Sequence, residues 1–507
     1  LPDVLLRPSS HTLDEVVVAA QYTKYRAGRY ECNLLGSPLV RNRNVMQLLD
    51  LLPGLRASDN SLSIKGSPVA AVYIDDRRVT DLSELTALRA EDIKSVEVEN
   101  KAGVAYSALT SGGVIRIRLK KLSAGSFYGN VSASASVSRD GYATNLSVPF
   151  ATQVGRLGIY NYVKGGYGEN KTLDRTHSEF RNSGYALDSE DRGNTSYRSI
   201  HELLSLVYNA NDRHSIGLGG QIFMGASDPT NTVGTTASEL AWGDVEPQMP
   251  AAGYTRYRYG GSLYNRQYQA SLNYTFRFDS LASKLTFKAG YLHQNVTRNY
   301  DYDTRDYRTP EAADPFSTEL RHEHYNLQGH SLAARLDLHK NFSDERGLIA
   351  GLSYDLHHAD NDAPVHRFED GSWQLDPQSS IWFVDRTQSS GAYTRWSDMY
   401  GKFTYLVGLR LQWDRITYRN AEDTGYKHRN YWRLFPELSL SYTFNEEKGT
   451  NLNLDLYRSS GALPGNNDLS PRRVWQSQYS YTVGNENLEP GWGYDIDLSY
   501  TLRNKLT

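Results

Sequence analysis

The sequence is poor in cysteine, in long apolar runs and in net charge. Its 507 residues include one cysteine, Cys32, so no internal disulfide can hold the fold. No apolar run reaches the roughly twenty residues that a membrane helix needs, and the net charge of −3 implies no polyanionic or acidic-lipid partner. These absences exclude a disulfide scaffold and a helical membrane protein. They do not exclude a membrane β-barrel, because only alternate residues of each barrel strand touch lipid.

Tyrosine and glycine are abundant, with 37 and 41 residues, a mixture that suits β-strands with aromatic belts better than helices. Residues 1–11 lack the basic start and the apolar core of a secretory signal peptide. If the protein is exported, we therefore expect this chain to be a processed form or a fragment.

Residues 44–121 read as one small domain of mixed helix and strand, of a size that folds as a unit. Five motifs follow one another in this stretch. They are a short amphipathic helix ending in Leu-Pro-Gly (44–54), Ser-Ile-Lys-Gly (63–66), a strand and turn containing Tyr-Ile-Asp-Asp (71–79), Glu-Asp-Ile-Lys-Ser-Val-Glu-Val (91–98), and Gly-Gly followed by an alternating strand (112–121). The order and spacing of the five together carry the signal, since each motif alone is weak.

This stretch resembles the plug domain of TonB-dependent outer-membrane receptors, with features of the Bacteroidota-type family. The resemblance implies a transmembrane antiparallel β-barrel with an N-terminal α+β plug inside its lumen. It also implies a location in the outer membrane of a Gram-negative bacterium. An unrelated α+β domain joined to a β-sandwich is the alternative.

After Lys121 the hydrophobic period changes to two. In the stretch from Tyr264 to Phe278, Leu272, Tyr274 and Phe276 alternate with polar residues, and several later stretches repeat this pattern. A soluble sandwich would bury the apolar face, whereas a membrane barrel turns it to lipid. Runs longer than ten residues and aromatics at strand ends favour the barrel.

Short and long connections alternate along this region, which is typical of barrel turns and outer loops. The count predicts about fourteen strands, whereas plugged transporters have about twenty-two, so we expect about eight further strands beyond this chain. The predicted organisation is an N-terminal segment at 1–24, a plug at 25–123, and a C-terminally incomplete barrel at 124–507.

The N-terminal segment contains a β-prone run, formed by Leu13, Asp14, Glu15, Val16, Val17 and Val18. The resemblance implies that this run is a candidate TonB box, the segment that pairs as a strand with periplasmic TonB. The alternative is that it forms the last strand of a preceding regulatory-like domain.

Arginine and aromatic residues gather in one predicted outer loop and strand tip. The candidate substrate-binding residues are Trp242, Tyr254, Arg256, Tyr257, Arg258 and Tyr259. Guanidinium groups bind carboxylates, phosphates or hydroxyls, and aromatic rings stack on flat ligands. Anchoring of a strand end at the membrane interface would explain the same residues.

No catalytic triad, phosphate-binding glycine loop or zinc motif is present, so we predict no enzyme activity and no cofactor. His357 and His358 lie near several acids, but strand alternation turns them to opposite faces, and we predict no metal site.

The predicted function is import of a nutrient into the periplasm, with TonB and its inner-membrane complex, outer-membrane lipid and a small-molecule, glycan or peptide ligand as partners. The alternative is a barrel that acts as a platform for surface lipoproteins or adhesion without transport. No nucleic acid is expected to bind.

Overall fold

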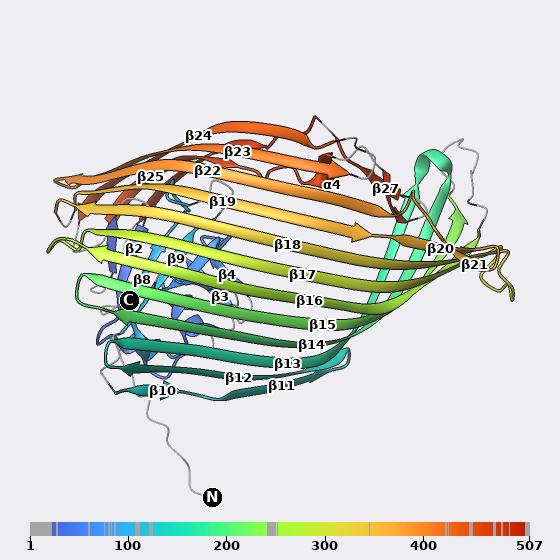
Figure 1. Ribbon diagram of the computed structural model, residues 1–507, viewed down its shortest axis with the longest axis horizontal. Helices are drawn as coiled ribbons and strands as arrows, with labels where there is room; N and C mark the ends of the chain where they lie inside the picture. Colours follow the sequence, from blue (N-terminus) through green and yellow to red (C-terminus); the bar gives the residue numbers. More distant parts are fainter. Residues whose placement is uncertain are drawn as a thin grey trace, which may run out of the picture.

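The computed structural model describes residues 23–501, except 27–28, 59–60, 76, 80–81, 83, 86–87, 107–111, 121–124, 241–249, 251, 344, 421–422, 424, 446–449, 470–472, 478–479 and 486. Within this range an N-terminal region of short elements precedes a sheet of long antiparallel strands (Figure 1). The predicted domain boundary at residues 123–124 lies outside the described residues, and the one at residues 24–25 falls within β1 (Thr23–Arg26). The domain bounds therefore stay predictions.

The N-terminal region, here called the plug, contains two small sheets and a short helix. Six strands form the larger sheet in the order β1-β2-β8-β9-β6-β7, in which β6 runs parallel to β9 and the other pairs are antiparallel. The remaining elements of the region are β2 (Arg29–Asn33), η1 (Pro38–Val40), α2 (Val45–Asp50), β3 (Leu55–Ser58), β4 (Ser61–Ile64), β5 (Ser67–Pro68), β6 (Ala71–Ile74), β7 (Arg77–Arg78), η2 (Ala90–Asp92), β8 (Ile93–Glu99) and β9 (Val114–Leu119).

Helix α2 begins where the sequence predicts and ends at Asp50, before the Leu-Pro-Gly motif that was expected to close it. The Asn44 side chain accepts a hydrogen bond from the Gln47 backbone N–H at 2.9 Å, and Gln47 Oε1 accepts one from the Asn44 N–H at 3.0 Å. This reciprocal capping satisfies two amides that the helix itself leaves unpaired. Leu48 and Leu49 of the helix are fully buried in one apolar core with Ile93 and Ile115 of the sheet. The plug therefore has a hydrophobic core of its own.

The glycine pair at the start of β9 permits a close approach of backbones. Gly112 has a φ of +97°, and a Cβ there would lie 2.3 Å from the Pro68 carbonyl oxygen. A Cβ on Gly113 would lie 2.6 Å from the Glu99 carbonyl oxygen. Only glycine meets both demands, because it has no side chain and adopts positive φ readily.

The large sheet contains 17 labelled strands among the described residues. They are β10 (Phe127–Gly129), β11 (Ser132–Ser138), β12 (Gly141–Val154), β13 (Leu157–Phe180), β14 (Tyr185–Asn209), β15 (His214–Glu239), β16 (Tyr254–Arg277), β17 (Lys284–Tyr307), β18 (Ser317–Asn341), β19 (Gly347–Ala363), β20 (Val365–Glu369), β21 (Ser372–Leu375), β22 (Ile381–Tyr400), β23 (Phe403–Asn420), β24 (Lys427–Asn445), β25 (Thr450–Ser460) and β28 (Trp492–Thr501). The connections contain η3 (Arg181–Ser183), α4 (Asn466–Leu469), β26 (Arg473–Ser477) and β27 (Ser480–Val483).

These strands occupy fourteen rows of the sheet in the described part of the chain. β10 and β11 share the same edge of β12, β20 continues β19 along β18, and β21 pairs with β20 in line with β22. The mostly β architecture and the predicted number of about fourteen strands are thus confirmed. None of the helices in the described ranges is long and apolar enough to cross a membrane.

Predicted short turns lie between successive strands, for example at residues 154–157 and 400–403. The predicted long polar loops, for example at residues 169–199 and 301–321, are largely wrong, because strands continue through most of them. β13 to β18 reach 24 to 26 residues each. At about 3.4 Å per residue such strands span about 80 Å, far more than the ~30 Å hydrocarbon core of a bilayer. Most of the extra length therefore lies in water, where polar strands pair through their backbones.

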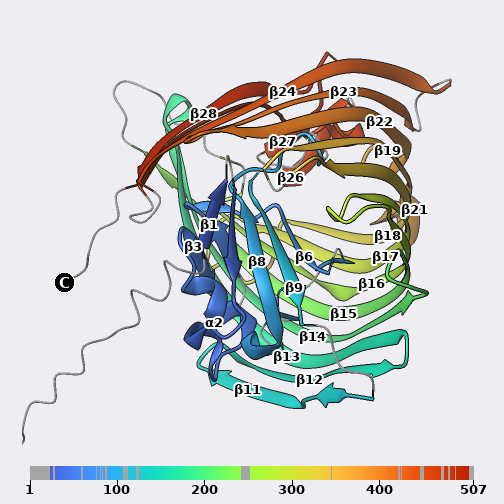
Figure 2. The same ribbon diagram turned by 90° about the vertical axis from the view of Figure 1, so that its left-hand side faces the viewer.

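The large sheet curves around the plug, which lies on its concave side (Figure 2). Among the described residues, the first row, β10 and β11, is not paired with the last strand, β28, so the sheet is an open barrel wall. The plug lies at the end of the wall where the short turns are (Figure 1).

Candidate functional site

The concave face of the wall, called the lumen face below, is polar and covered, while the outer face is apolar and open. On β24, Glu437 and Ser439 are 7% and 4% exposed, whereas Leu434 and Phe444 on the other face are 45% and 48% exposed. A soluble sandwich shows the reverse arrangement. The outer face thus has the apolar surface that a lipid-facing barrel wall requires.

One group of buried ionic contacts joins the plug to this wall. Glu437 on β24 accepts a hydrogen bond from the Val104 backbone N–H of the plug at 3.0 Å and from Arg395 on β22 at 2.9 Å. Arg395 also lies 3.8 Å from Glu99 at the end of β8. As whole residues, Glu99, Arg395 and Glu437 are 3%, 5% and 7% exposed. We call Glu99, Arg395 and Glu437 the junction triad.

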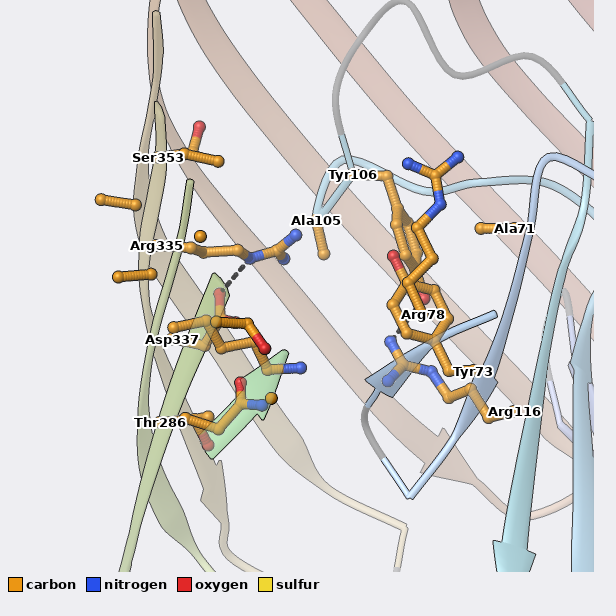
Figure 3. Close-up of a pocket in the computed structure, with 18 of the residues that line it drawn as sticks. Ala71, Tyr73, Arg78, Ala105, Tyr106, Arg116, Thr286, Arg335, Asp337 and Ser353 are labelled. Atoms are coloured by element: carbon orange, nitrogen blue, oxygen red, sulfur yellow. Dashed lines mark hydrogen bonds and ion pairs between the residues drawn. The ribbon is translucent and has the colours of Figure 1, made fainter. Parts of the chain in front are cut away.

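A cavity of 480 Å³ lies between the plug and the wall. Figure 3 shows Tyr73, Arg78, Tyr106 and Arg116 of the plug on one side, facing Arg335 of β18 on the other. In the described lining, nine lysine or arginine side chains face four aspartate or glutamate side chains. The cavity wall is therefore strongly cationic, although the chain as a whole has a net charge of −3.

Burial alone would raise the pKa of Glu97 at the edge of this cavity. The neighbouring guanidinium groups of Arg29, 3.0 Å away, and of Arg116 and Arg118 outweigh that effect and hold its pKa below the usual value. Glu97 is therefore ionised and balances part of the positive charge on the plug side of the cavity.

A second group of side chains lies on the lumen face farther from the short turns, and we call it the tyrosine cluster. Tyr257 stacks on Tyr302 at a ring-centroid distance of 5.9 Å, and Tyr259 lies 5.8 Å from Tyr300. The Tyr302 hydroxyl donates a hydrogen bond to Glu323 at 2.7 Å. The complete cluster is Tyr257, Tyr259, Arg298, Tyr300, Tyr302, Arg321, Glu323 and Tyr325.

The arginines of the tyrosine cluster are held by both rings and carboxylates. Arg298 pairs with Glu323 and lies 4.8 Å from the Tyr325 ring centroid. Arg321 lies 5.3 Å from the Tyr302 ring centroid and 3.4 Å from Glu319. The surface that results is rich in aromatic faces and hydroxyl groups but nearly neutral, so it suits stacking and hydrogen bonding.

The structure separates the predicted substrate-binding residues. Tyr257 and Tyr259 belong to the tyrosine cluster and share the lumen face with Ser271, which lines the cavity. Tyr254, Arg256 and Arg258 lie at alternate positions on the opposite face, where Arg256 donates to the Tyr307 hydroxyl at 2.5 Å. Trp242 lies outside the described residues, as do Leu13 to Val18.

Sequence reasoning missed the partners from β17 and β18, which include Tyr300, Tyr302, Arg298 and Glu323. Their signal was present, because Tyr300 and Tyr302 are two residues apart and so share one strand face. The sequence alone does not give the strand register, which places Tyr259 of β16 opposite Tyr302 of β17. The histidines behave as expected: His357 bonds to Ser331 at 2.9 Å, while His358 lies 3.3 Å from Asp360 on the other face.

With this geometry established, comparison with known proteins shows which family and which folds the chain is similar to. Residues 276–507 match the profile of the outer membrane protein beta-barrel family. The structure resembles the copper transporter OprC, with 13% identity and a TM-score of 0.51 over 95% of this chain and 71% of that one. It resembles equally a double mutant of the Serratia marcescens hemophore receptor HasR in complex with its hemophore HasA and heme, with 13% identity and a TM-score of 0.51 over 94% and 69%.

The C-terminal part of the chain is therefore similar to an outer-membrane β-barrel family. The chain as a whole shares the fold of these two solved proteins, with a curved antiparallel wall and an N-terminal region on its concave side. The chain spans 63% of the ferric citrate transporter FecA and 60% of the Pseudomonas aeruginosa ferripyoverdine receptor. No curated protein sequence matches it.

Proposed function

We propose that this protein is a TonB-dependent receptor that imports a nutrient from the cell surface into the periplasm. In this proposal the tyrosine cluster holds the ligand on the lumen face. The plug blocks passive flow until TonB pairs with the N-terminal run Leu13 to Val18 and draws the plug out of place. Ligand binding would favour the plug state in which that run is accessible.

One observation supports import over a static platform. The main plug core is built almost wholly from plug residues, with Tyr160 as the wall side chain packed against it. Contacts to the wall instead include the junction triad with its hydrogen bond from Val104, the ion pair of Lys65 with Asp497 at 3.7 Å, and cation–ring contacts such as that of Lys101 with Tyr457. A small apolar group of Val104, Ala105 and Tyr393 adds to them. A body with its own core and a mainly polar attachment can move without unfolding, because its apolar residues stay buried.

Among the similar proteins, OprC is a copper transporter, and the HasR structure is a complex of a hemophore receptor with its hemophore and heme. The proposal is tested with a panel of labelled probes of different chemistry. We choose ferric citrate, heme and a maltooligosaccharide, which differ in charge and in aromatic character.

The test is uptake of these probes by cells that express the complete protein as wild type or Val17→Pro. Proline removes one backbone N–H and prevents strand pairing with TonB, but leaves the barrel untouched. We expect energy-dependent uptake of at least one probe by the wild type and loss of that uptake in the variant, with surface binding retained. Val17→Thr keeps the N–H and the β-branch and serves as the matched control.

Two results would contradict the proposal. Uptake by Val17→Pro at the wild-type rate would remove the assigned role of this run. Absence of energy-dependent uptake of every probe by the wild type, with the protein present at the surface, would favour the platform function instead.

A further inference from the structure

The described lining of the cavity between plug and wall contains more lysines and arginines than carboxylates. Three of the four lining carboxylates are already paired: Glu97 with Arg29 at 3.0 Å, Asp337 with Arg335 at 2.8 Å, and Glu99 with Arg395 at 3.8 Å. The described lining contains nine lysines and arginines. A sheltered cavity lined by more cations than anions attracts anionic ligands.

Arg410 on β23 is the sharpest case. It is 2% exposed, and its guanidinium donates to neutral partners, Gln412 Oε1 at 2.8 Å and Ser353 Oγ at 2.9 Å. No carboxylate among the described residues forms an ion pair with it within 4.0 Å, and Asp355, which also lines the cavity, and Asp414 act on it from farther away. The Tyr393 ring, 5.6 Å away, offers only a weak compensation. A buried guanidinium whose hydrogen-bond partners are neutral is well placed to bind an anion.

Cations from the plug face this wall across the cavity (Figure 3). The Arg116 guanidinium lies 5.6 Å from the ring centroids of both Tyr73 and Tyr106. From the wall side, Arg335 lies 5.8 Å from the same Tyr106 ring. Tyr106 thus stands between cations of the two bodies, and an anion beside it would contact both.

We propose that this cavity is an anion-binding site, and that the anion bridges the plug and the barrel wall. The ligand chemistry is a small polyanion bearing carboxylate or phosphate groups, because arginine forks bind both in pairs of hydrogen bonds. Arg410 and Arg335 bind it from the wall, and Arg116 and Arg78 bind it from the plug. The proposal does not depend on transport, since a bound anion would stabilise the seated plug in any outer-membrane role.

The experiment uses the complete protein in detergent, with inorganic phosphate and citrate as separate probes and sodium chloride of equal ionic strength as reference. Calorimetric titration and the thermal unfolding temperature report binding. For the wild type we expect saturable binding of at least one probe and a rise in unfolding temperature above that in chloride. Tighter binding of citrate indicates a ligand with carboxylate groups, and tighter binding of phosphate indicates a ligand with a phosphate group. Either result supports the site.

Three variants locate the binding. Arg410→Gln removes the buried charge and should weaken binding about tenfold or more. Ser353→Asp places a carboxylate beside the Arg410 guanidinium, so it should raise the unfolding temperature without anion and abolish the anion-dependent rise. Arg192→Gln, on the outer hairpin of β14, removes an exposed guanidinium and should bind as the wild type.

The Ser353→Asp variant keeps the proposal testable if Arg410→Gln fails to fold, because it adds a negative charge to the site instead of removing a positive one. The proposal fails if neither probe binds saturably to the wild type beyond the chloride reference. It also fails if Arg410→Gln and Ser353→Asp both bind with wild-type affinity.

Discussion

The plug and the barrel wall are both built from β-strands, but they place their apolar residues on opposite sides: inside the plug and on the outer face of the wall. In the plug, Ile93 and Ile115 are fully buried in an apolar core. In the wall, Asp414 is fully buried on the lumen side and Val407 is 50% exposed on the outside. The hydrophobic effect orders both, because each places its apolar face away from water, against a core in one case and against lipid in the other.

Buried ion pairs connect the plug to the wall, and the junction triad contains them in three side chains. The largest expected effect is therefore that of Glu437→Gln, which removes one charge from a buried group. Arg395 would lose its closest carboxylate, and removal of one partner of a buried ion pair costs about 3–5 kcal/mol. Limited proteolysis and urea titration of the plug in the assembled protein measure this loss.

The matched control is Glu190→Gln, which breaks an exposed pair with Arg175 at 2.9 Å on the outer hairpin. Exposed pairs contribute about 0–1 kcal/mol, so its plug should resist protease as in the wild type. Equal behaviour of the two variants would show that the triad does not hold the plug in place.

A smaller effect tests whether the outer face of the wall meets lipid. Leu409 on β23 is 43% exposed between Val407 and Leu411, which are exposed as well. Leu409→Arg should destabilise the barrel in a bilayer by about 2–4 kcal/mol, because arginine is costly near the midplane. Folding into lipid vesicles measures this, with Ser271→Arg on the lumen face as the control. If both substitutions lower the folding stability by the same amount, the two faces do not lie in different environments.

The smallest effect concerns the tyrosine cluster and leaves the fold intact. Tyr259→Ala should weaken binding of the imported probe about three- to tenfold, since an aromatic contact contributes about 0.5–1.5 kcal/mol. Tyr254→Ala, on the opposite face of the same strand, is the control and should bind normally. Equilibrium binding to the purified protein decides between them, and equal affinities would remove the cluster from the ligand site.

Part of the fold could be predicted because its signals are local. The period of two assigns faces to each strand, Asn44 and Gln47 define a helix start, and Gly112 with Gly113 defines a tight approach. The extent of the strands could not be predicted in the same way. Beyond the membrane both faces of a strand are wet, so alternation disappears while the backbone ladder continues. This is why β13 and β14 run through a predicted loop.

The sequence by itself determined the two regions, the alternation of the wall and the small plug elements, because those depend on neighbouring residues. Only the tertiary structure decided the junction triad, the cationic cavity and the tyrosine cluster. Val104 and Glu437 are 333 residues apart in the chain, and Tyr302 and Glu323 lie on separate strands. Such contacts follow from strand register and from the position of the plug inside the wall, and no local pattern encodes either.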